Sequence, residues 1–351
     1  MSVTEKLPPP TADGRIIAGV ITRRRFGWAG AGYTPAMHED SLDPDTNAPE
    51  GRVVDSGPAV QPADHSLLGD LGEAAEMIAF KHSVFALPFA LMSLITAAGD
   101  GWPTAATWAW VITAMISART AAMSFNRLAD HGLDAINPRT MNRSLPAGRL
   151  GRRFAWIVTV VAALVFVGAA AMLNRLCLML AIPTLAILLG YSFAKRWTAA
   201  AHLWLGFSLG IAPIGAWIAV TGAIAVPPLI LGAAVMLWVA GFDTIYSLQD
   251  EVFDRSHGLR SIPAAFGPGV ALWMARFFHV LALVGFSGFA IAAGGGWLRF
   301  AAVMAAAFLM MWQHRLVRAD DLSAVDAAFF TANGLLSVMM CSLFVIAKLV
   351  A

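Results

Sequence analysis

Long apolar stretches are the feature of this sequence that most restricts its possible folds. A helix needs about 20 predominantly apolar residues to cross a hydrocarbon core about 30 Å thick, and such stretches are recognised by their length and lack of charge. We count nine in the 351 residues, at 82–99, 104–124, 154–173, 176–193, 201–220, 226–248, 270–292, 296–313 and 327–349. The sequence therefore predicts an all-α integral membrane protein with about nine transmembrane helices.

Composition supports the same fold class. Hydrophobic residues make up 58% of the chain and charged residues 13%, whereas a soluble domain carries about 25% charged residues. The net charge of +2 is spread over short loops, so no basic stripe indicates a nucleic-acid partner. The lipid bilayer is the expected partner, and no sequence feature indicates an obligate protein partner.

The first 74 residues differ from the rest of the chain. They contain three consecutive prolines at 8–10 and many Asp, Gly and Ala residues, without apolar periodicity. This composition is typical of a disordered segment. We therefore divide the chain into a disordered polar extension at 1–74 and a membrane domain at 75–351.

Positive charges in the loops predict the orientation, because cytoplasmic loops carry the excess of Lys and Arg. The opposite face holds only Arg175, Arg299 and Lys348. The loops after the second, fourth, sixth and eighth stretches hold Arg127, Arg139, Arg143, Arg149, Arg152, Arg153, Lys195, Arg196, Arg255, Arg260, Arg315 and Arg318. This asymmetry predicts a cytoplasmic N-terminus and an outside C-terminus.

Two related acidic passages follow the second and sixth stretches. Asp130 and Asp134 are four residues apart, as are Asp250 and Asp254, and each pair precedes an Arg-Ser-(Leu or Ile)-Pro-Ala tail. Four stretches separate the copies, and an even number preserves orientation, so this is a parallel repeat whose carboxylates can meet across one cavity. A single interfacial Asp is typically a solvated charge, but solvation alone gives no reason to repeat both spacing and tail.

The spacing also indicates a ligand for these carboxylates. Residues i and i+4 share one face of a helix, where like charges destabilise it, so we expect cations to offset them. Hard divalent ions such as Mg²⁺ bind a few protein carboxylates together with water and substrate phosphate oxygens. Both acidic passages lie on the face predicted to be cytoplasmic.

At these residues the sequence resembles the UbiA-type family of intramembrane prenyltransferases. The family motif Asn-x-x-x-Asp-x-x-x-Asp is matched at Asn126, and the likeness runs from about Lys81 to Asn333. The resemblance implies helices around a central cavity open to lipid, and an enzyme that transfers a polyprenyl group from its diphosphate to an aromatic acid. The matched residues are most similar to the 4-hydroxybenzoate polyprenyltransferase branch, which also includes enzymes that prenylate a dihydroxynaphthoate in the futalosine route to menaquinone.

The resemblance also implies roles for individual residues. The four repeated aspartates would hold Mg²⁺ against the diphosphate, and Asn126 would contact the metal or phosphate or, alternatively, cap the polar end of its helix. Arg139 and Arg143 can clamp phosphate; we favour Arg143 because Arg260 repeats it. Lys195 and Arg196, which follow Tyr191, are similar to a family position near the diphosphate, although positive-inside topology also explains these cations.

Three further residues are candidate site residues. Tyr246 can hydrogen-bond a ligand or stabilise a cation through its ring, or simply anchor the interface. Asp243 lies deeper in its stretch, where a carboxylate is costly and so indicates function, as a base or as a partner of another site residue. The resemblance places His82 near the acceptor, although interface histidines are commonly only solvated.

A secondary transporter is the contrasting class, because carboxylates and repeats also mark those proteins. Here the carboxylates lie at the ends of helices and the repeat is parallel, which favours a diphosphate site over a midplane ion site. We therefore expect an enzyme of respiratory quinone biosynthesis in a bacterial inner membrane, with its active-site loops in the cytoplasm.

Overall fold

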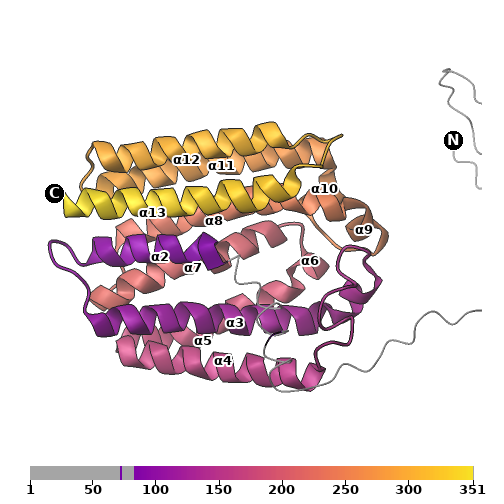
Figure 1. The fold of residues 1–351 in the computed structure, drawn as a ribbon, viewed down its shortest axis with the longest axis horizontal. Coiled ribbons are helices and arrows are strands. Elements are labelled where there is room, and N and C mark those ends of the chain that lie inside the picture. Colours follow the sequence, from indigo (N-terminus) through magenta and orange to yellow (C-terminus); the bar gives the residue numbers. More distant parts are fainter. Residues whose placement is uncertain (1–71, 73–82, 351) are drawn as a thin grey trace, which may run out of the picture. The chain divides into compact units, whose positions relative to one another are not determined.

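The computed structural model describes residues 83–350 together with Gly72, and its regular elements within this part are helices (Figure 1). The extension predicted at 1–74 is therefore outside the described residues, apart from Gly72. A long helix occupies each of the nine apolar stretches: α2 (Ser83–Ala97), α3 (Ala105–Ile136), α4 (Arg152–Leu173), α5 (Arg175–Gly190), α7 (Ala201–Thr221), α8 (Val226–Tyr246), α11 (Pro268–Ala292), α12 (Trp297–Leu316) and α13 (Asn333–Leu349).

Length and composition qualify six helices of the described part as membrane spans. They are α4, α5 with its continuation to Trp197, α7, α8 with its continuation to Ser256, α11, and α13 with the π turn η4 (Ala327–Ala332). The outward face of α4 is apolar, with Ile157, Val161 and Leu164 all exposed. The all-α membrane architecture is confirmed, whereas the count of nine crossings stays a prediction.

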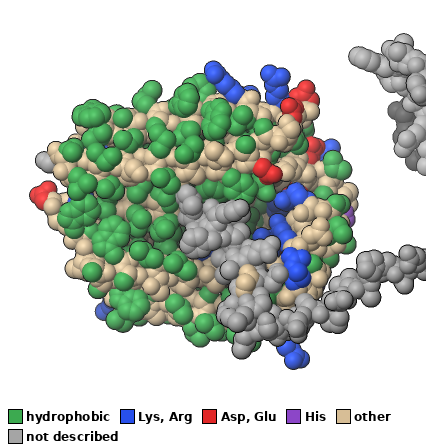
Figure 2. Space-filling model, viewed as in Figure 1, with side chains coloured by type: hydrophobic (Ala, Val, Ile, Leu, Met, Phe, Trp, Pro, Cys, Tyr) green, Lys and Arg blue, Asp and Glu red, His purple; other side chains and the backbone are tan. Residues whose placement is uncertain are grey.

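Charged side chains gather at one end of the helices (Figure 2), near the short helices α6 (Ala194–Trp197), α9 (Glu251–Ser256) and α10 (Ile262–Phe266). Apolar side chains cover much of the remaining visible surface in this view. This distribution fits a protein whose apolar helices are surrounded by lipid and whose polar loops lie at the membrane surface.

Helix α3 extends twelve residues beyond the end predicted at position 124 and stops at Ile136. The apolar run ends at 124, but no proline follows until Pro138, so the backbone can continue as a helix through polar residues. Asn137, which precedes that proline, has extended dihedrals (φ −88°, ψ 117°), as expected of a residue before proline. The first acidic passage is therefore part of a helix rather than a loop.

The ends of α5 and α8 resemble each other. Helix α5 passes through the 3-10 turn η2 (Tyr191–Phe193) into α6, and α8 passes through the 3-10 turn η3 (Ser247–Asp250) into α9. A 3-10 turn is tighter than an α-helical one, so each turn redirects the side chains that follow it. These two junctions carry Lys195 and Asp254 towards the same region of the protein.

The core of the described part is built around α8. Twelve residues of α8 are buried, against two on α5. The indole of Trp238 is fully buried and contacts Phe89 of α2 and Phe242, with ring centroids 5.1 and 4.9 Å away. Helix α8 packs against both α7 and α11, while α2 packs against α7 and α13.

Small residues allow α7 and α8 to approach closely. A Cβ atom at Gly206 would lie 2.1 Å from the carbonyl oxygen of Met236, and one at Gly210 would lie 2.4 Å from that of Gly232. Neither distance is tolerable, so glycine is required at both positions of α7. Small residues spaced four apart commonly allow this kind of contact between membrane helices.

Candidate active site

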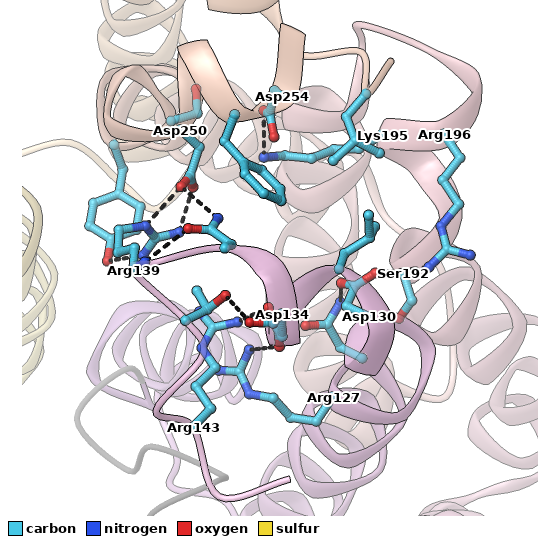
Figure 3. A pocket seen from close by; sticks show the side chains of 18 of the residues that line it. Arg127, Asp130, Asp134, Arg139, Arg143, Ser192, Lys195, Arg196, Asp250 and Asp254 are labelled. Carbon is cyan, nitrogen blue, oxygen red and sulfur yellow. Dashed lines mark hydrogen bonds and ion pairs between the residues drawn. The ribbon is translucent and has the colours of Figure 1, made fainter. Parts of the chain in front are cut away.

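Both acidic passages face one polar cavity of about 180 Å³ (Figure 3). The lining includes five aspartates and five Lys or Arg side chains. The lining residues are Asn126, Arg127, Asp130, Leu133, Asp134, Asn137, Arg139, Thr140, Arg143, Tyr191, Ser192, Lys195, Arg196, Asp243, Tyr246, Ser247, Asp250, Phe253, Asp254 and Leu259. The cavity therefore contains as many formal negative as positive charges.

The first acidic motif projects from one face of α3. The amide of Asn126 donates to Oδ2 of Asp130 over 3.0 Å, one helical turn away. The guanidinium of Arg196 donates to the other oxygen of Asp130 over 3.1 Å, and the same guanidinium nitrogen also donates to the carbonyl of Ala129 over 2.6 Å. Helix α6 thus supplies the cation for the first aspartate of α3.

The second aspartate of α3 is more deeply placed. Asp134 is 6% exposed, and Nη1 of Arg143 donates to its Oδ1 over 2.7 Å. Arg127, two turns before it on the same helix, lies 4.0 Å from Oδ2. From the sequence we expected Arg127 to be a topology charge only. Its spacing of seven residues from Asp134 is the signal that could have placed it in the site.

Asp250 accepts a two-pronged contact from Arg139 (Figure 3). Nε of Arg139 donates to Oδ1 over 2.8 Å, Nη2 donates to Oδ2, and Asn137 adds an amide bond of 3.3 Å. Nη1 of Arg139 also donates to the hydroxyl of Tyr246 over 3.3 Å. Burial acts to lower the pKa of Arg139, but its hydrogen bonds to Asp250 and the charge of that carboxylate outweigh this effect and raise the pKa.

Asp254 completes the set from α9. It is 2% exposed, and Nζ of Lys195 donates to its Oδ2 over 3.0 Å. Lys195 belongs to α6, between α5 and α7, so this ion pair joins two segments that are far apart in the sequence. Each of the four repeated aspartates therefore has a Lys or Arg partner, as the like-charge spacing predicted.

Two predicted binding residues are not in the described lining of the cavity. The guanidinium of Arg260 donates to the carbonyl of Trp197 at the end of α6 over 2.8 Å; its contact with phosphate stays a prediction. His82 is outside the described residues. The repeated tail has another explanation: its Ser and Leu or Ile are buried in both copies, namely Ser144, Leu145, Ser261 and Ile262.

An apolar cavity of about 420 Å³ adjoins the polar one. Asn126 and Tyr191 line both cavities, so the two spaces meet at the polar end of α3 and α5. Along α3 the apolar lining runs back from Asn126 to Val111, which is about 22 Å at 1.5 Å per residue. The described part thus provides a charged chamber beside a long apolar one, and the two share Asn126 and Tyr191 as lining residues.

Comparison with known proteins identifies the family. Residues 86–335 match the model of the UbiA prenyltransferase family. The chain belongs to this family. It is 31% identical over 244 residues to a 4-hydroxybenzoate octaprenyltransferase from Nitrosomonas eutropha, covering 67% of this chain and 82% of that protein. It is 26% identical over 251 residues to the enzyme of the same name from Neisseria gonorrhoeae, covering 70% and 83%.

Solved UbiA structures show the same fold. The apo structure of a UbiA homologue from Aeropyrum pernix K1 matches with a TM-score of 0.70 and 33% identity, over 76% of this chain and 98% of that one. A UbiA homologue from Archaeoglobus fulgidus, bound to DMAPP and Mg²⁺, matches with a TM-score of 0.62 and 16% identity, over 80% and 100%. This chain is therefore an integral membrane prenyltransferase of the UbiA family.

Proposed function

We propose that this protein transfers a polyprenyl group from its diphosphate to an aromatic acid in quinone biosynthesis, with 4-hydroxybenzoate as the first acceptor to test. The junction of the charged and apolar cavities at Asn126 and Tyr191 is the observation that carries this proposal. A polyprenyl diphosphate has the same two parts, an anionic head and an apolar chain. The names of the relatives from Nitrosomonas and Neisseria support the choice of acceptor.

The basic side chains of the cavity suit a diphosphate. Arg139 and Arg143 already bind carboxylates, and the planar guanidinium binds phosphate oxygens in the same way. Lys195 and Arg196 contact the carboxylates of Asp254 and Asp130 from α6. We propose that these cations transfer from carboxylate to phosphate when the diphosphate binds.

The aspartates released from those contacts suit Mg²⁺. Asp130, Asp134, Asp250 and Asp254 offer only oxygen donors, which Mg²⁺ prefers, and Mg²⁺ typically takes one or two carboxylates together with substrate phosphate. No three His, Cys, Asp or Glu side chains in the described part are close enough to hold a metal by themselves, so metal and diphosphate would bind together. Bound Mg²⁺ supplies positive charge that neutralises the departing diphosphate.

The remaining residues set the position of the chain and acceptor. The apolar cavity, lined by residues such as Ile112, Met115 and Leu180, excludes water and suits a prenyl chain. The ring and hydroxyl of Tyr246 lie beside Arg139, where we propose that the tyrosine faces the allylic carbon as it gains positive charge. We place the site on the cytoplasmic side of a bacterial inner membrane, where the acid is dissolved.

Prenyl transfer by protein reconstituted in lipid nanodiscs tests this function. Octaprenyl diphosphate is supplied with 4-hydroxybenzoate or with a dihydroxynaphthoate, and mass spectrometry measures the product. We expect product with 4-hydroxybenzoate, its loss on chelation of divalent ions, and a loss of at least 100-fold in Asp130→Asn, because charge stabilisation by one group typically contributes that much. The control is Asp320→Asn, which changes an exposed aspartate that does not line the cavity.

Two results would reverse the proposal. Product with the naphthoate alone would keep the reaction type and change the acceptor. Metal-independent uptake of a solute into vesicles, without prenylated product from either acceptor, would instead favour the transporter class.

A further inference from the structure

One aspartate of the polar cavity differs from the other four. Asp130, Asp134, Asp250 and Asp254 each contact a Lys or Arg. Asp243 does not: its hydrogen-bond partner in the described part is the imidazole of His202, whose Nδ1 lies 2.7 Å from Oδ2 of the carboxylate. No Lys or Arg within the described residues pairs with Asp243, although it lines the same cavity.

The hydrogen bonds of His202 define its protonation. The backbone N–H of Ile262 points to Nε2 over 3.3 Å, and a backbone N–H can only donate. Nε2 must therefore accept and carry no proton, so the proton of a neutral imidazole is on Nδ1 and is donated to Asp243.

This arrangement leaves Asp243 with one carboxylate oxygen that is open to accept a proton, on a carboxylate that no described Lys or Arg contacts. Its Oδ2 is held by His202, and its Oδ1 makes no hydrogen bond in the described part of the chain. The four other carboxylates are already neutralised by cations or, in the proposed function, by metal. A carboxylate that is oriented by a neutral imidazole and faces the cavity is suited to accept a proton.

We propose that Asp243 takes the ring proton of the acceptor and that His202 is the positioning residue that orients it; this inference rests on the proposed function. The C–O bond of the prenyl diphosphate breaks, and its electron pair leaves with the diphosphate. A π electron pair of the ring forms the new C–C bond. The ring C–H bond then breaks, its electrons restore aromaticity, and the proton passes to Oδ1 of Asp243.

The contacts of His202 explain why this residue is histidine. It begins α7, contacts Asp243 on α8 and receives the backbone of Ile262 at the start of α10. Asparagine can place an amide donor near the position of Nδ1, whereas leucine offers no donor. His202→Asn should therefore preserve part of the orientation that His202→Leu removes.

Isotope effects separate this role from a merely structural one. Prenyl transfer is measured with 4-hydroxybenzoate and with the same acid deuterated on the ring carbons beside the hydroxyl. In His202→Leu we expect kcat to fall about 10- to 100-fold, with the KM for the donor unchanged and a deuterium isotope effect larger than that of the wild type. His202→Asn should retain more activity, and Asp243→Asn should show the largest isotope effect.

The control is His314→Asn, which changes a histidine of α12 that contacts His279 of α11; neither histidine lines the polar cavity, so the isotope effect should equal that of the wild type. If Asp243→Asn and the His202 variants keep the wild-type isotope effect, the proton goes elsewhere, for example to diphosphate, and the inference is wrong. If His202→Leu does not fold, the isotope effects of Asp243→Asn and His202→Asn test the inference instead. A folded wild type without prenylated product would refute the proposed function first, and this inference with it.

Discussion

The two-pronged contact between Arg139 and Asp250 allows a quantitative test of the site. Asp250 is 7% exposed, and removing the partner of a buried charge typically costs about 3–5 kcal/mol. The side chain of Arg139 is 31% exposed, so solvent screens part of this interaction. Hydrogen bonds to charged groups contribute about 1.5–3 kcal/mol each. Because solvent screening reduces the cost expected for a fully buried pair, we expect a coupling free energy between Arg139 and Asp250 of about 2 kcal/mol. This corresponds to a change of about 30-fold in the unfolding equilibrium.

A double-mutant cycle isolates this coupling. Arg139→Ala, Asp250→Ala and the double variant are unfolded at equilibrium in mixed detergent micelles, with tryptophan fluorescence as the signal. The matched control is the exposed pair Arg255 and Glu251, which are 2.8 Å apart and should couple by about 0.3–0.5 kcal/mol. If the Arg139 cycle gives no more than this control, Asp250 is not held by a partly buried ion pair and the electrostatic argument for the cavity fails.

Two further predictions concern helix packing and the apolar cavity. Gly206→Ala should prevent folding or lower the stability in detergent by several kcal/mol, because the added Cβ would overlap the carbonyl of Met236. The control Gly168→Ala, whose Cβ would meet nothing within 4 Å, should leave the stability nearly unchanged. Equal stability of the two variants would contradict the close packing of α7 and α8. Ala118→Phe should block the apolar cavity about 12 Å from Asn126, so kcat/KM should fall for octaprenyl diphosphate and stay similar for DMAPP; an unchanged ratio would show that the chain lies elsewhere.

The sequence predicted those parts of the fold and site that depend on local pattern. Apolar length was enough to find every long helix of the described part. The spacing of Asp130 and Asp134 predicted a shared face, which α3 confirms. The predicted end of α3 was wrong because the length of an apolar stretch indicates where the lipid ends, whereas proline and backbone geometry determine where a helix stops.

Pairing between distant residues could not be predicted in the same way. Nothing in the sequence indicates that Arg139 reaches Asp250 or that Lys195 reaches Asp254, because both contacts depend on the 3-10 turns and on helix packing. Arg260 was chosen by symmetry with Arg143, but the repeat preserves the buried Ser-(Leu or Ile) core of the tail and not the direction of the arginine. His202 belongs to no sequence motif, and only its contacts with Asp243 and Ile262 indicate a role in the site.

The length of α3 has a consequence for how the two substrates meet. From Ala105 to Asn126 the helix covers about 32 Å, which matches a hydrocarbon core of about 30 Å. If α3 crosses the bilayer upright, as its apolar stretch predicts, Asp130 and Asp134 lie about 6 and 12 Å beyond the lipid tails. A lipid-borne donor can present its head group there without leaving the bilayer, and a water-soluble acid can reach it without entering. The length of α3 would thus determine how far Asp130 and Asp134 lie from the hydrocarbon core.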